Sequence, residues 1–353
     1  MPAPNQPLNG RGASANPANR FERLACEPDP DCPDEEAPLP RTQFFKDDTQ
    51  SIIARNNSPD VGFDAGINAY RGCEHGCIYC YARPSHEYLG FSAGLDFESK
   101  IMVKERAPEL LRKALSSPRW KPEVVAMSGN TDCYQPAERR FRITRRCLEV
   151  FLEFRNPVGI ITKNHLVTRD IDLLRELAKF DCVSVAISIT TLDENLRKKM
   201  EPRTSPPQRR LTALRALREA GIPAGVMTAP MIPGLNDHEM PAILAAAGEA
   251  GALFAGFVPV RLPHGVAPLF EQWLEEHYPG RKEKILNRIR DLRDGKLNDP
   301  NFVTRMQGSG VWAEQMSALF EAGCKKAGIK NNFPGLSTKH FRRSREQLLL
   351  FAD

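Results

Sequence analysis

Three cysteines stand close together in the chain, Cys73, Cys77 and Cys80, with the spacing C-x3-C-x2-C. Thiolates are the usual ligands of iron–sulfur clusters and of many zinc sites. Gly72 and Gly76 belong to the same segment, and glycine lets the backbone wrap closely because it tolerates positive φ. A cubane cluster is normally held by four thiolates, so three leave one iron open. We therefore predict a [4Fe–4S] cluster on Cys73, Cys77 and Cys80, whose open iron could bind a cofactor and pass it one electron.

Two other interpretations of the same loop stay open. His75 could complete a zinc site with the three cysteines, which would make the protein a non-catalytic, zinc-stabilised, nucleic-acid-binding module. His75 lies between two of the ligands, however, where reaching the same metal is sterically awkward. A structural cluster with four thiolates would need a distant fourth cysteine, and Cys133 is the main candidate.

The elements that must position this loop follow a regular alternation of strands and helices. Apolar strand-like runs are predicted at 123–128, 158–163, 182–190, 222–230 and 252–260, after a first unit that leads into the cysteine loop. Helices are predicted at 136–154, 171–180, 207–220, up to about 251, and 268–277. Such repetition implies parallel strands with right-handed crossovers. About six units fit, so we predict an α/β fold, a partial (β/α)6 TIM-like barrel with its active site at the carboxyl ends of the strands.

Composition divides the 353 residues into three parts. Residues 1–45 are rich in proline and poor in apolar residues, so we predict a disordered tail, in which Cys26 and Cys32 are exposed thiols. Residues 60–275 form the predicted barrel. Residues 276–353 form a charged helical extension that ends in a basic tail.

The chain as a whole has the character of a soluble protein. It has no apolar run long enough for a membrane span and no secretory signal at its start. Its nine cysteines are an odd number in a mid-sized chain, which does not indicate a disulfide framework. We expect a cytoplasmic location, reduced thiols and no membrane partner.

The cysteine loop, C-x3-C-x-aromatic-C after the first strand of a partial barrel, resembles the radical S-adenosylmethionine (SAM) superfamily. More narrowly, YRGCEHGCIYCYARPSHEYLG and NTDCYQPAE resemble an uncharacterised bacterial branch near spore photoproduct lyase. The resemblance implies that the open iron binds S-adenosylmethionine. It also implies a lyase-like radical enzyme, in which reductive cleavage yields a 5′-deoxyadenosyl radical that abstracts hydrogen from a substrate.

The same resemblance assigns cofactor contacts to residues at the strand ends. Tyr79, before the last cysteine, is expected at the adenine, and Ser188 at the ribose. A Gly-Gly-Glu motif that binds the amino group is absent here, and its place is taken by Ser128, Gly129, Asn130 and Thr131. Arg203 could clamp the carboxylate of S-adenosylmethionine, or it could pair with Glu201 as a surface salt bridge.

Cys133 and Tyr134 are the candidates for direct radical chemistry. A thiol and a phenol beside a radical could relay a hydrogen atom back to the product, as the resemblance to spore photoproduct lyase suggests. The alternative for Cys133 is packing in the core.

Two partners are expected besides the unknown substrate. The radical chemistry implied by the resemblance needs an electron donor such as flavodoxin or ferredoxin. Nucleic acid is a candidate substrate, because arginines cluster on the predicted helix at 136–154 and a basic stripe attracts phosphates. The opposing interpretation is that these arginines form only the solvated face of an amphipathic helix.

Overall fold

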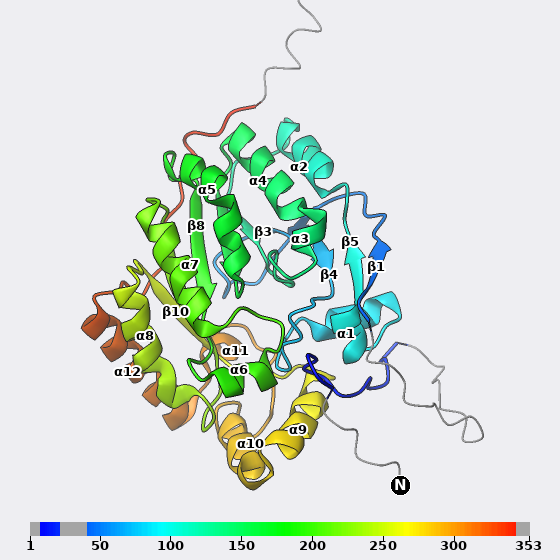
Figure 1. The fold of residues 1–353 in the computed structure, drawn as a ribbon, viewed down its shortest axis with the longest axis vertical. Helices are drawn as coiled ribbons and strands as arrows, with labels where there is room; N and C mark the ends of the chain where they lie inside the picture. The colour runs from blue at the N-terminus through cyan, green and yellow to red at the C-terminus, as the bar shows by residue number, and fades with distance from the viewer. Residues whose placement is uncertain (1–7, 22–40, 344–353) are drawn as a thin grey trace, which may run out of the picture.

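The main sheet of the computed structural model confirms the partial barrel. The structure describes residues 8–21 and 41–343. Seven strands lie in the order β10-β9-β8-β7-β6-β3-β2 (Figure 1). Six of them run parallel: β3 (Ala65–Ile67), β6 (Val125–Met127), β7 (Val158–Thr162), β8 (Val183–Ser188), β9 (Ala224–Met231) and β10 (Ala255–Pro259). β2 (Ile53–Arg55) pairs antiparallel with β3 at one edge, so the barrel does not close.

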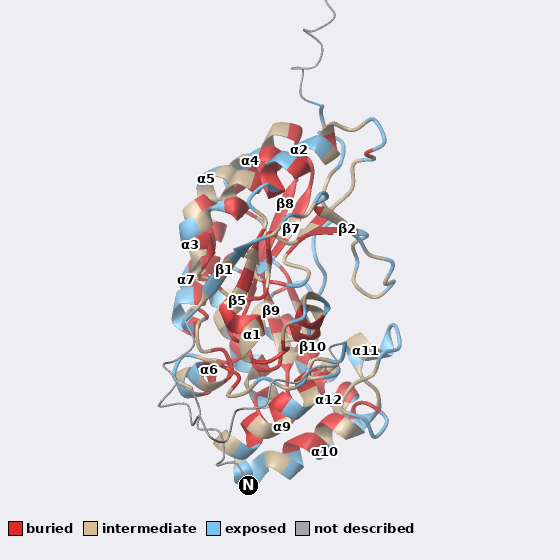
Figure 2. Cartoon of the chain, turned by 90° about the vertical axis from the view of Figure 1, so that its right-hand side faces the viewer, coloured by how far each residue is buried: buried red, intermediate tan, exposed pale blue. Residues whose placement is uncertain are grey.

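Alternate residues of each strand face opposite sides of this sheet. Val183, Val185 and Ile187 of β8 belong to the main hydrophobic core, packed against the helices. Ser184 and Ser188 alternate with them and face the concave side. β7 and β8 appear among the buried elements of the interior in Figure 2. The concave side is where a barrel of this type places its ligands.

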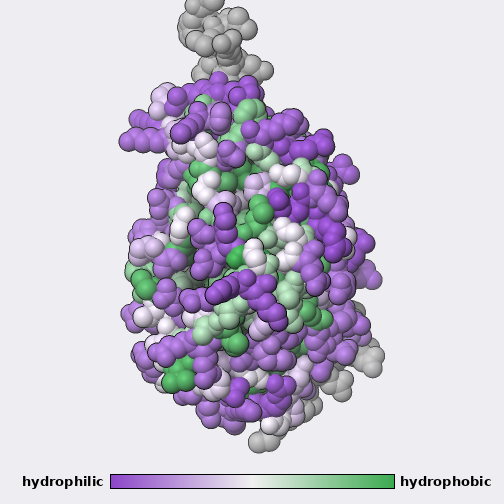
Figure 3. Space-filling model, turned by 90° about the vertical axis from the view of Figure 1, so that its left-hand side faces the viewer, coloured by the Kyte–Doolittle hydropathy of each residue, from purple (hydrophilic) through white to green (hydrophobic). Residues whose placement is uncertain are grey.

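The helices that connect the strands cover the outer side. They are α2 (Ala107–Ser116), α4 (Ile143–Phe154), α5 (Ile171–Ala178), α7 (Pro207–Glu219) and α8 (Met240–Glu249). Each turns apolar residues inward, whereas the outer surface seen in Figure 3 is mostly hydrophilic, with smaller hydrophobic areas between. Burial of these apolar faces against the sheet is the main stabilising contribution.

The helix predicted over 136–154 is two helices in the structure. α3 (Glu138–Phe141) ends at Arg142, which adopts a left-handed conformation with φ of 51°, and α4 begins immediately after it. Glu138 accepts a hydrogen bond from the backbone N–H of Thr144 at 3.1 Å, which satisfies the start of α4. The side chain of a buried glutamate therefore takes part in the break, which apolar periodicity does not reveal.

A second, small sheet holds the segment that carries the cysteines. β1 (Gln43–Lys46), β5 (Lys100–Val103) and β4 (Tyr70–Arg71) form it in the order β1-β5-β4. The strand at residues 100–103 therefore belongs to this sheet and not to the barrel. The 3-10 helix η1 (Arg83–Leu89) and the short α1 (Leu95–Ser99) connect the cysteine loop to β5.

In the described part of the chain, four α-helices follow the last barrel strand. A short helix, α6, follows β8 and packs with two of them. α6 (Glu194–Met200), α9 (Val266–His277) and α10 (Lys282–Asp291) bury residues in a second core that also contains Cys77, Ile78 and Tyr79. α11 (Thr304–Gln307) is short, and α12 (Gly310–Ala327) packs along α8. The helical nature of the C-terminal part is confirmed, while its boundary at 275 stays a prediction. Among the described helices, none is both long and apolar enough to cross a membrane.

Residues 8–21, which we call the N-terminal strap, differ from the expected disordered tail. Ala13 is buried in the second core, and Ser14 Oγ donates to Glu276 Oε1 at 2.7 Å (Figure 1, dark blue). Backbone N–H groups of Gly12 and Ala13 donate to the Glu98 carboxylate at 3.0 and 2.9 Å. These contacts form with residues far along the chain, so tail composition does not predict them. Cys26 and Cys32 lie outside the described residues.

Candidate functional site

The cysteine loop consists of successive tight turns at the carboxyl end of the barrel. Backbone N–H groups three residues downstream donate to the carbonyls of all three cysteines, at 3.3 Å for Cys73, 3.2 Å for Cys77 and 3.2 Å for Cys80. Gly72 and Gly76 have φ of 79° and 66°. A Cβ on Gly72 would lie 2.9 Å from the carbonyl oxygen of Phe97, so both conformation and space call for glycine here.

The three thiols share a buried environment. Cys73 and Cys77 are buried, and Cys80 is partly exposed. Burial raises the pKa of all three thiols, and the mutual repulsion of the thiolates raises those of Cys73 and Cys77 further. Thiolates at these positions would need a bound metal centre to stabilise them, and its binding would release the protons. Such a donor set, soft and close together on one loop, fits an iron–sulfur cluster.

Both ring nitrogens of His75 lie against groups other than the three thiols. Its Nδ1 lies 3.3 Å from Asp132 Oδ2, at an ion-pair distance without good hydrogen-bond alignment, and its Nε2 lies 3.2 Å from Asn164 Nδ2. Both ring nitrogens thus face groups at the ends of β6 and β7. Within the described part of the chain, no three Cys, His, Asp or Glu side chains converge closely enough to hold a single metal ion.

Asp132 ties the cysteine loop to the barrel. Its carboxylate accepts hydrogen bonds from Thr162 Oγ1 and from the backbone N–H of Lys163, both at 2.7 Å, besides facing His75. Burial would raise the pKa of Asp132, but His75 and these hydrogen bonds lower it below its usual value. This residue is therefore a carboxylate that positions the loop.

Arg83 and Glu98 form a buried ion pair on another side of the loop, with neither side chain exposed. Arg83 also donates to the carbonyl of Cys77 at 3.0 Å and to that of Gly76 at 3.3 Å. Because the N-terminal strap donates to the same Glu98, one carboxylate joins the strap, Arg83 and the loop. The backbone of the loop is therefore held from several directions.

Lys163 contributes a positive charge to the mouth of the barrel. It follows β7, and its Nζ donates to Ser188 Oγ at 2.8 Å, to Thr190 Oγ1 at 2.9 Å and to the carbonyl of Ala229 at 3.0 Å. It also lies 3.1 Å from Glu201 Oε1, and its side chain is 15% exposed. Ser188, the predicted ribose contact, thus accepts a hydrogen bond from a lysine that was not among the predicted site residues.

Glu201 joins the mouth to the cysteine loop. Its carboxylate pairs with Arg210, and neither side chain is exposed. It also accepts from Thr190 Oγ1 at 2.6 Å and from the hydroxyl of Tyr79. Burial would raise the pKa of Glu201, but the charges of Arg210 and Lys163 lower it far below its usual value. The structure therefore brings Tyr79 and Ser188 together through one ionic network.

The segment that replaces the expected Gly-Gly-Glu motif lies at the end of β6. Ser128 has φ of 88°, and its Oγ accepts from the backbone N–H of Cys133 at 3.0 Å. The backbone N–H groups of Asn130 and Thr131 donate to Asn68 Oδ1 at 2.9 and 3.3 Å. Asn68 follows β3, so this loop is fastened to the neighbouring strand end.

Tyr81 connects that loop to the last cysteine. Its hydroxyl donates to the carbonyl of Gly129. The side chain follows Cys80 directly and is among the exposed large apolar residues, at 48%. The guanidinium of Arg261, at the end of β10, lies 5.4 Å from its ring centroid. Tyr81 was not among the predicted site residues, although its position directly after Cys80 could have indicated that it lies near the site.

Cys133 and Tyr134 are not at the mouth. Both are buried in the main core, on the side of the sheet that the helices cover. The hydroxyl of Tyr134 donates to Asp170 Oδ2 at 3.1 Å, at the start of α5. Burial raises the pKa of both groups well above their usual values. The structure thus separates this pair from the residues it gathers around Lys163, and the hydrogen relay stays only a hypothesis.

Arg203 also lies away from the mouth. Its guanidinium is 2.9 Å from Glu74 Oε1 in the cysteine loop and donates to Thr42 Oγ1 at 3.1 Å. The alternative pairing of Arg203 with Glu201 is wrong, because Glu201 is occupied by Arg210 and Lys163. Arg203 and Glu201 are close in sequence but point in different directions, so each pairs with a different charged residue.

Comparisons of the sequence with known proteins give a matching family and several relatives. A family profile described as the radical SAM superfamily matches residues 67–247. An uncharacterized protein of Mycobacterium tuberculosis, Rv2578c, is 36% identical over 252 residues, which cover 70% of this chain and 72% of that protein. An uncharacterized protein of Methanocaldococcus jannaschii, MJ0683, is 32% identical over 222 residues, covering 63% of this chain and 79% of that protein.

Solved structures of spore photoproduct lyase share the fold. The complex with dinucleoside spore photoproduct has a TM-score of 0.59 and 15% identity, and covers 82% of each chain. A mutant of the same enzyme with bound AdoMet and dinucleoside spore photoproduct has a TM-score of 0.60 and 16% identity, covering 83% of this chain and 82% of that one. At this level of identity the likeness concerns the fold.

Proposed function

The chain belongs to the radical SAM superfamily and is an enzyme of that class, and from this premise we propose that Cys73, Cys77 and Cys80 hold a [4Fe–4S] cluster. One observation carries the proposal: three thiols on one loop, two of them buried and the third partly buried, lie at the open end of a six-stranded parallel barrel, near a lysine at its mouth. When bound, the cluster supplies the electron that cleaves S-adenosylmethionine to give the 5′-deoxyadenosyl radical.

The mouth residues would bind and orient the cofactor. Lys163 is the group that we assign to the carboxylate of S-adenosylmethionine, which would take the place of one of the three hydrogen bonds that its ammonium makes to Ser188, Thr190 and Ala229. Tyr79 and Ser188 supply hydroxyls for the nucleoside part. This assignment replaces Arg203, whose guanidinium is paired with Glu74 on another side of the cysteine loop.

The β6 loop completes the proposed cofactor site. The carbonyl oxygens and side-chain oxygens at Ser128, Gly129, Asn130 and Thr131 are the acceptors available at this strand end for the amino group of S-adenosylmethionine. The positive φ of Ser128 and the bonds to Asn68 hold this backbone in a defined turn. Preorganised backbone groups cost little reorganisation when they bind a charged group.

We propose nucleic acid as the substrate class, with chemistry like that of a DNA-repair lyase. Tyr81 offers an exposed ring beside the proposed cluster, with the guanidinium of Arg261 near its face. Aromatic rings and arginines are the groups on which unstacked bases lie in nucleic-acid-binding proteins. The shared fold with spore photoproduct lyase, whose complexes contain a dinucleoside photoproduct, supports the same assignment.

The cluster and the cofactor cleavage are tested together on anaerobically purified protein. We expect a brown protein with about four irons per chain, which releases 5′-deoxyadenosine when given dithionite and S-adenosylmethionine. Cys77→Ser should lose both properties. The matched control is Cys324→Ser, because Cys324 is an equally buried thiol far away on α12. Protein with an intact cluster that cleaves no S-adenosylmethionine would refute the proposal, and colourless zinc protein would support the binding-module interpretation.

The substrate class is tested by binding and by isotope transfer. Ultraviolet-irradiated single-stranded and duplex oligodeoxynucleotides should bind, and Tyr81→Ala should weaken binding by about 1–3 kcal/mol, the usual value of one base–aromatic stack. Tyr88→Ala is the control, because Tyr88 is an exposed tyrosine on η1. Deuterium in the oligonucleotide should appear in 5′-deoxyadenosine. Absence of binding and of transfer would remove nucleic acid as the substrate.

A further inference from the structure

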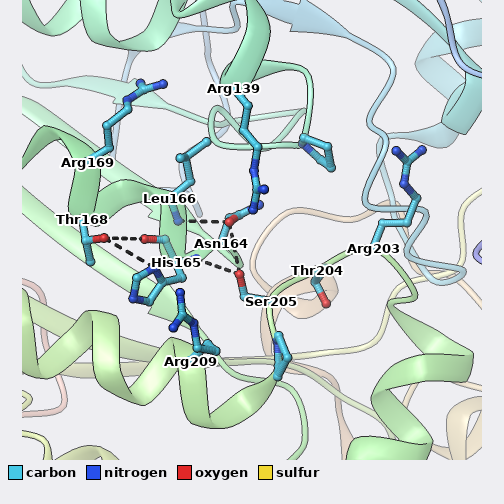
Figure 4. Close-up of a pocket in the computed structure, with 12 residues that line it drawn as sticks. Arg139, Asn164, His165, Leu166, Thr168, Arg169, Arg203, Thr204, Ser205 and Arg209 are labelled. Carbon is cyan, nitrogen blue, oxygen red and sulfur yellow. Dashed lines mark hydrogen bonds between the residues drawn. The ribbon is translucent and has the colours of Figure 1, made fainter.

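A basic pocket of about 710 Å³ lies over the amino-terminal ends of the outer helices (Figure 4). The β6, β7 and β8 connections each contribute side chains to it. Its basic lining residues are Arg139, His165, Arg169, Arg203 and Arg209. Of the twelve described residues drawn around it, none is acidic. A concave surface of one sign of charge concentrates the electric field and attracts ligands of opposite charge.

Two of these arginines supply charge that no carboxylate balances in the described part of the chain. Arg169 pairs with Glu138 and Asp170, and Arg203 with Glu74. Ion pairs of that kind are not found for Arg139 and Arg209, which are both exposed. Figure 4 shows their side chains extending into the pocket from opposite sides.

The effect of that charge is visible on His165 in the same pocket. Burial lowers the pKa of His165, and the positive charges of Arg209 and Arg139 lower it further. The pocket therefore has an unbalanced positive field at its centre, and an anionic surface would relieve the repulsion.

The pocket is in contact with the cysteine loop. Asn164, which lines the pocket, lies 3.2 Å from His75 Nε2, and the backbone N–H of Arg203 donates to the carbonyl of His75 at 3.3 Å. His75 stands between Cys73 and Cys77. A partner bound in the pocket would thus lie next to the loop that carries the three cysteines.

The pocket and the mouth of the barrel lie on opposite sides of the same strand end. Lys163 points to the concave side, where it contacts Ser188 and Thr190. Asn164 is the next residue, and it points the other way, to His75 and Ser205. Alternation along an extended chain produces this division. A substrate in the mouth and a partner in the pocket would therefore not compete for space.

We propose that this pocket is the docking site of an acidic one-electron carrier protein of the flavodoxin or ferredoxin type. The inference rests on the proposed function, since only a reducible cluster needs such a partner. In the docked complex the reduced carrier loses one electron and the enzyme gains it, and no bond forms or breaks in that step. The position beside the cysteine loop, away from the concave face, favours the carrier over the nucleic-acid substrate.

The first test measures binding of a recombinant bacterial flavodoxin to the holoenzyme by calorimetry at low and moderate salt. Arg139→Glu/Arg209→Glu should weaken binding about tenfold or more and reduce its salt dependence. The control is Arg175→Glu/Arg215→Glu, exposed arginines of α5 and α7 outside the pocket lining, which changes the net charge equally. Arg139→Gln/Arg209→Gln should give an intermediate affinity, and circular dichroism of each variant checks that it is folded.

The second test compares two reductants by following the cluster absorbance in a stopped-flow instrument. The Arg139→Glu/Arg209→Glu variant should be reduced about tenfold more slowly by reduced flavodoxin, but at the unchanged rate by dithionite, which needs no protein docking. Dithionite-driven cleavage of S-adenosylmethionine should also be unchanged. If the unmodified enzyme does not cleave S-adenosylmethionine with dithionite, the proposed function is refuted, and not the docking site.

Three outcomes would overturn the docking proposal. The first is equal flavodoxin affinity in the pocket variant and in the unmodified enzyme. The second is an equal loss of affinity in the pocket variant and the control variant, which would show only a general charge effect. The third is loss of oligonucleotide binding in the pocket variant while flavodoxin binding is kept, which would assign the pocket to nucleic acid.

Discussion

Glu201→Gln tests the ionic network that organises the mouth of the barrel. Both oxygens of the Glu201 carboxylate accept hydrogen bonds: Oε2 from Arg210, and Oε1 from Thr190 and Tyr79. Lys163 Nζ lies 3.1 Å from Oε1 as an ion pair. Glutamine has nearly the same shape but only one acceptor oxygen. Its amide N–H₂ must then face either Arg210 or Lys163, and a donor would meet a donor.

The expected decrease in the free energy of unfolding follows from the burial of the pair. Neither Glu201 nor Arg210 is exposed, and removing one partner of a buried pair costs about 3–5 kcal/mol. Arg210 also donates to the carbonyls of Ser205 at 2.8 Å and Ser188 at 2.9 Å, so we expect a value near 3 kcal/mol, at the lower end of the range for such pairs.

The assay is urea unfolding followed by tryptophan fluorescence. The free energy of unfolding is extrapolated to water with the same dependence on urea concentration for all variants. Glu194→Gln is the matched control on the neighbouring helix α6. Glu194 pairs with Arg197 but its side chain is 42% exposed, so the change should stay within about 0.5 kcal/mol. A loss below about 1 kcal/mol for Glu201→Gln would refute the view that this carboxylate is an essential buried partner.

The contribution of Glu201 to stability changes with pH in a definite direction. The pKa of Glu201 is lowered in the folded protein, since the charges of Arg210 and Lys163 outweigh the effect of burial, which raises it. The carboxylate therefore stabilises the fold fully above its unfolded pKa of about 4.3 and progressively less as the pH falls below it. The difference between the unmodified protein and Glu201→Gln should be constant near neutrality and shrink only in acid.

Three further predictions concern the loops around the site. Lys163→Met should lower the affinity for S-adenosylmethionine by about 10- to 100-fold, the value of one charge-assisted hydrogen bond, without loss of iron; equal affinity measured by equilibrium dialysis would exclude it as the carboxylate contact. Gly12→Ala should displace the N-terminal strap, because the new Cβ would lie 1.7 Å from the carbonyl oxygen of Gly76, and it should lower the free energy of unfolding by about 1–3 kcal/mol; unchanged stability and unchanged protease resistance of the strap would contradict this. Cys133→Ser should cost about 1–3 kcal/mol for a buried hydroxyl and leave 5′-deoxyadenosine formation unchanged; altered deuterium transfer would instead support the relay.

The sequence predicted the barrel correctly because its signals are local. Strands such as Val183–Ser188 are continuous apolar runs, and the helices between them carry their own periodicity and end signals. The cysteine spacing with its two glycines is equally local, since the turns it needs depend on residues within the loop. The break at Arg142 between α3 and α4 was missed, because Glu138 produces it together with the packing around it.

The site was predicted only in part because side-chain direction depends on distant partners. Lys163 and Asn164 are neighbours in sequence, yet one faces the mouth and the other faces His75. Cys133 stands next to candidate cofactor residues in the chain but turns into the core. Arg203 was predicted to contact the cofactor carboxylate, with nearby Glu201 as the alternative partner, whereas the structure pairs it with Glu74.

By itself, then, the sequence determined the parallel barrel, and it predicted a cluster on Cys73, Cys77 and Cys80. Local backbone preference and apolar periodicity suffice for both. Only the tertiary structure decided that Glu201 joins Tyr79, Lys163 and Arg210 at the mouth. Buried charges must be paired wherever the fold brings them together, and that meeting place is a property of the packed chain.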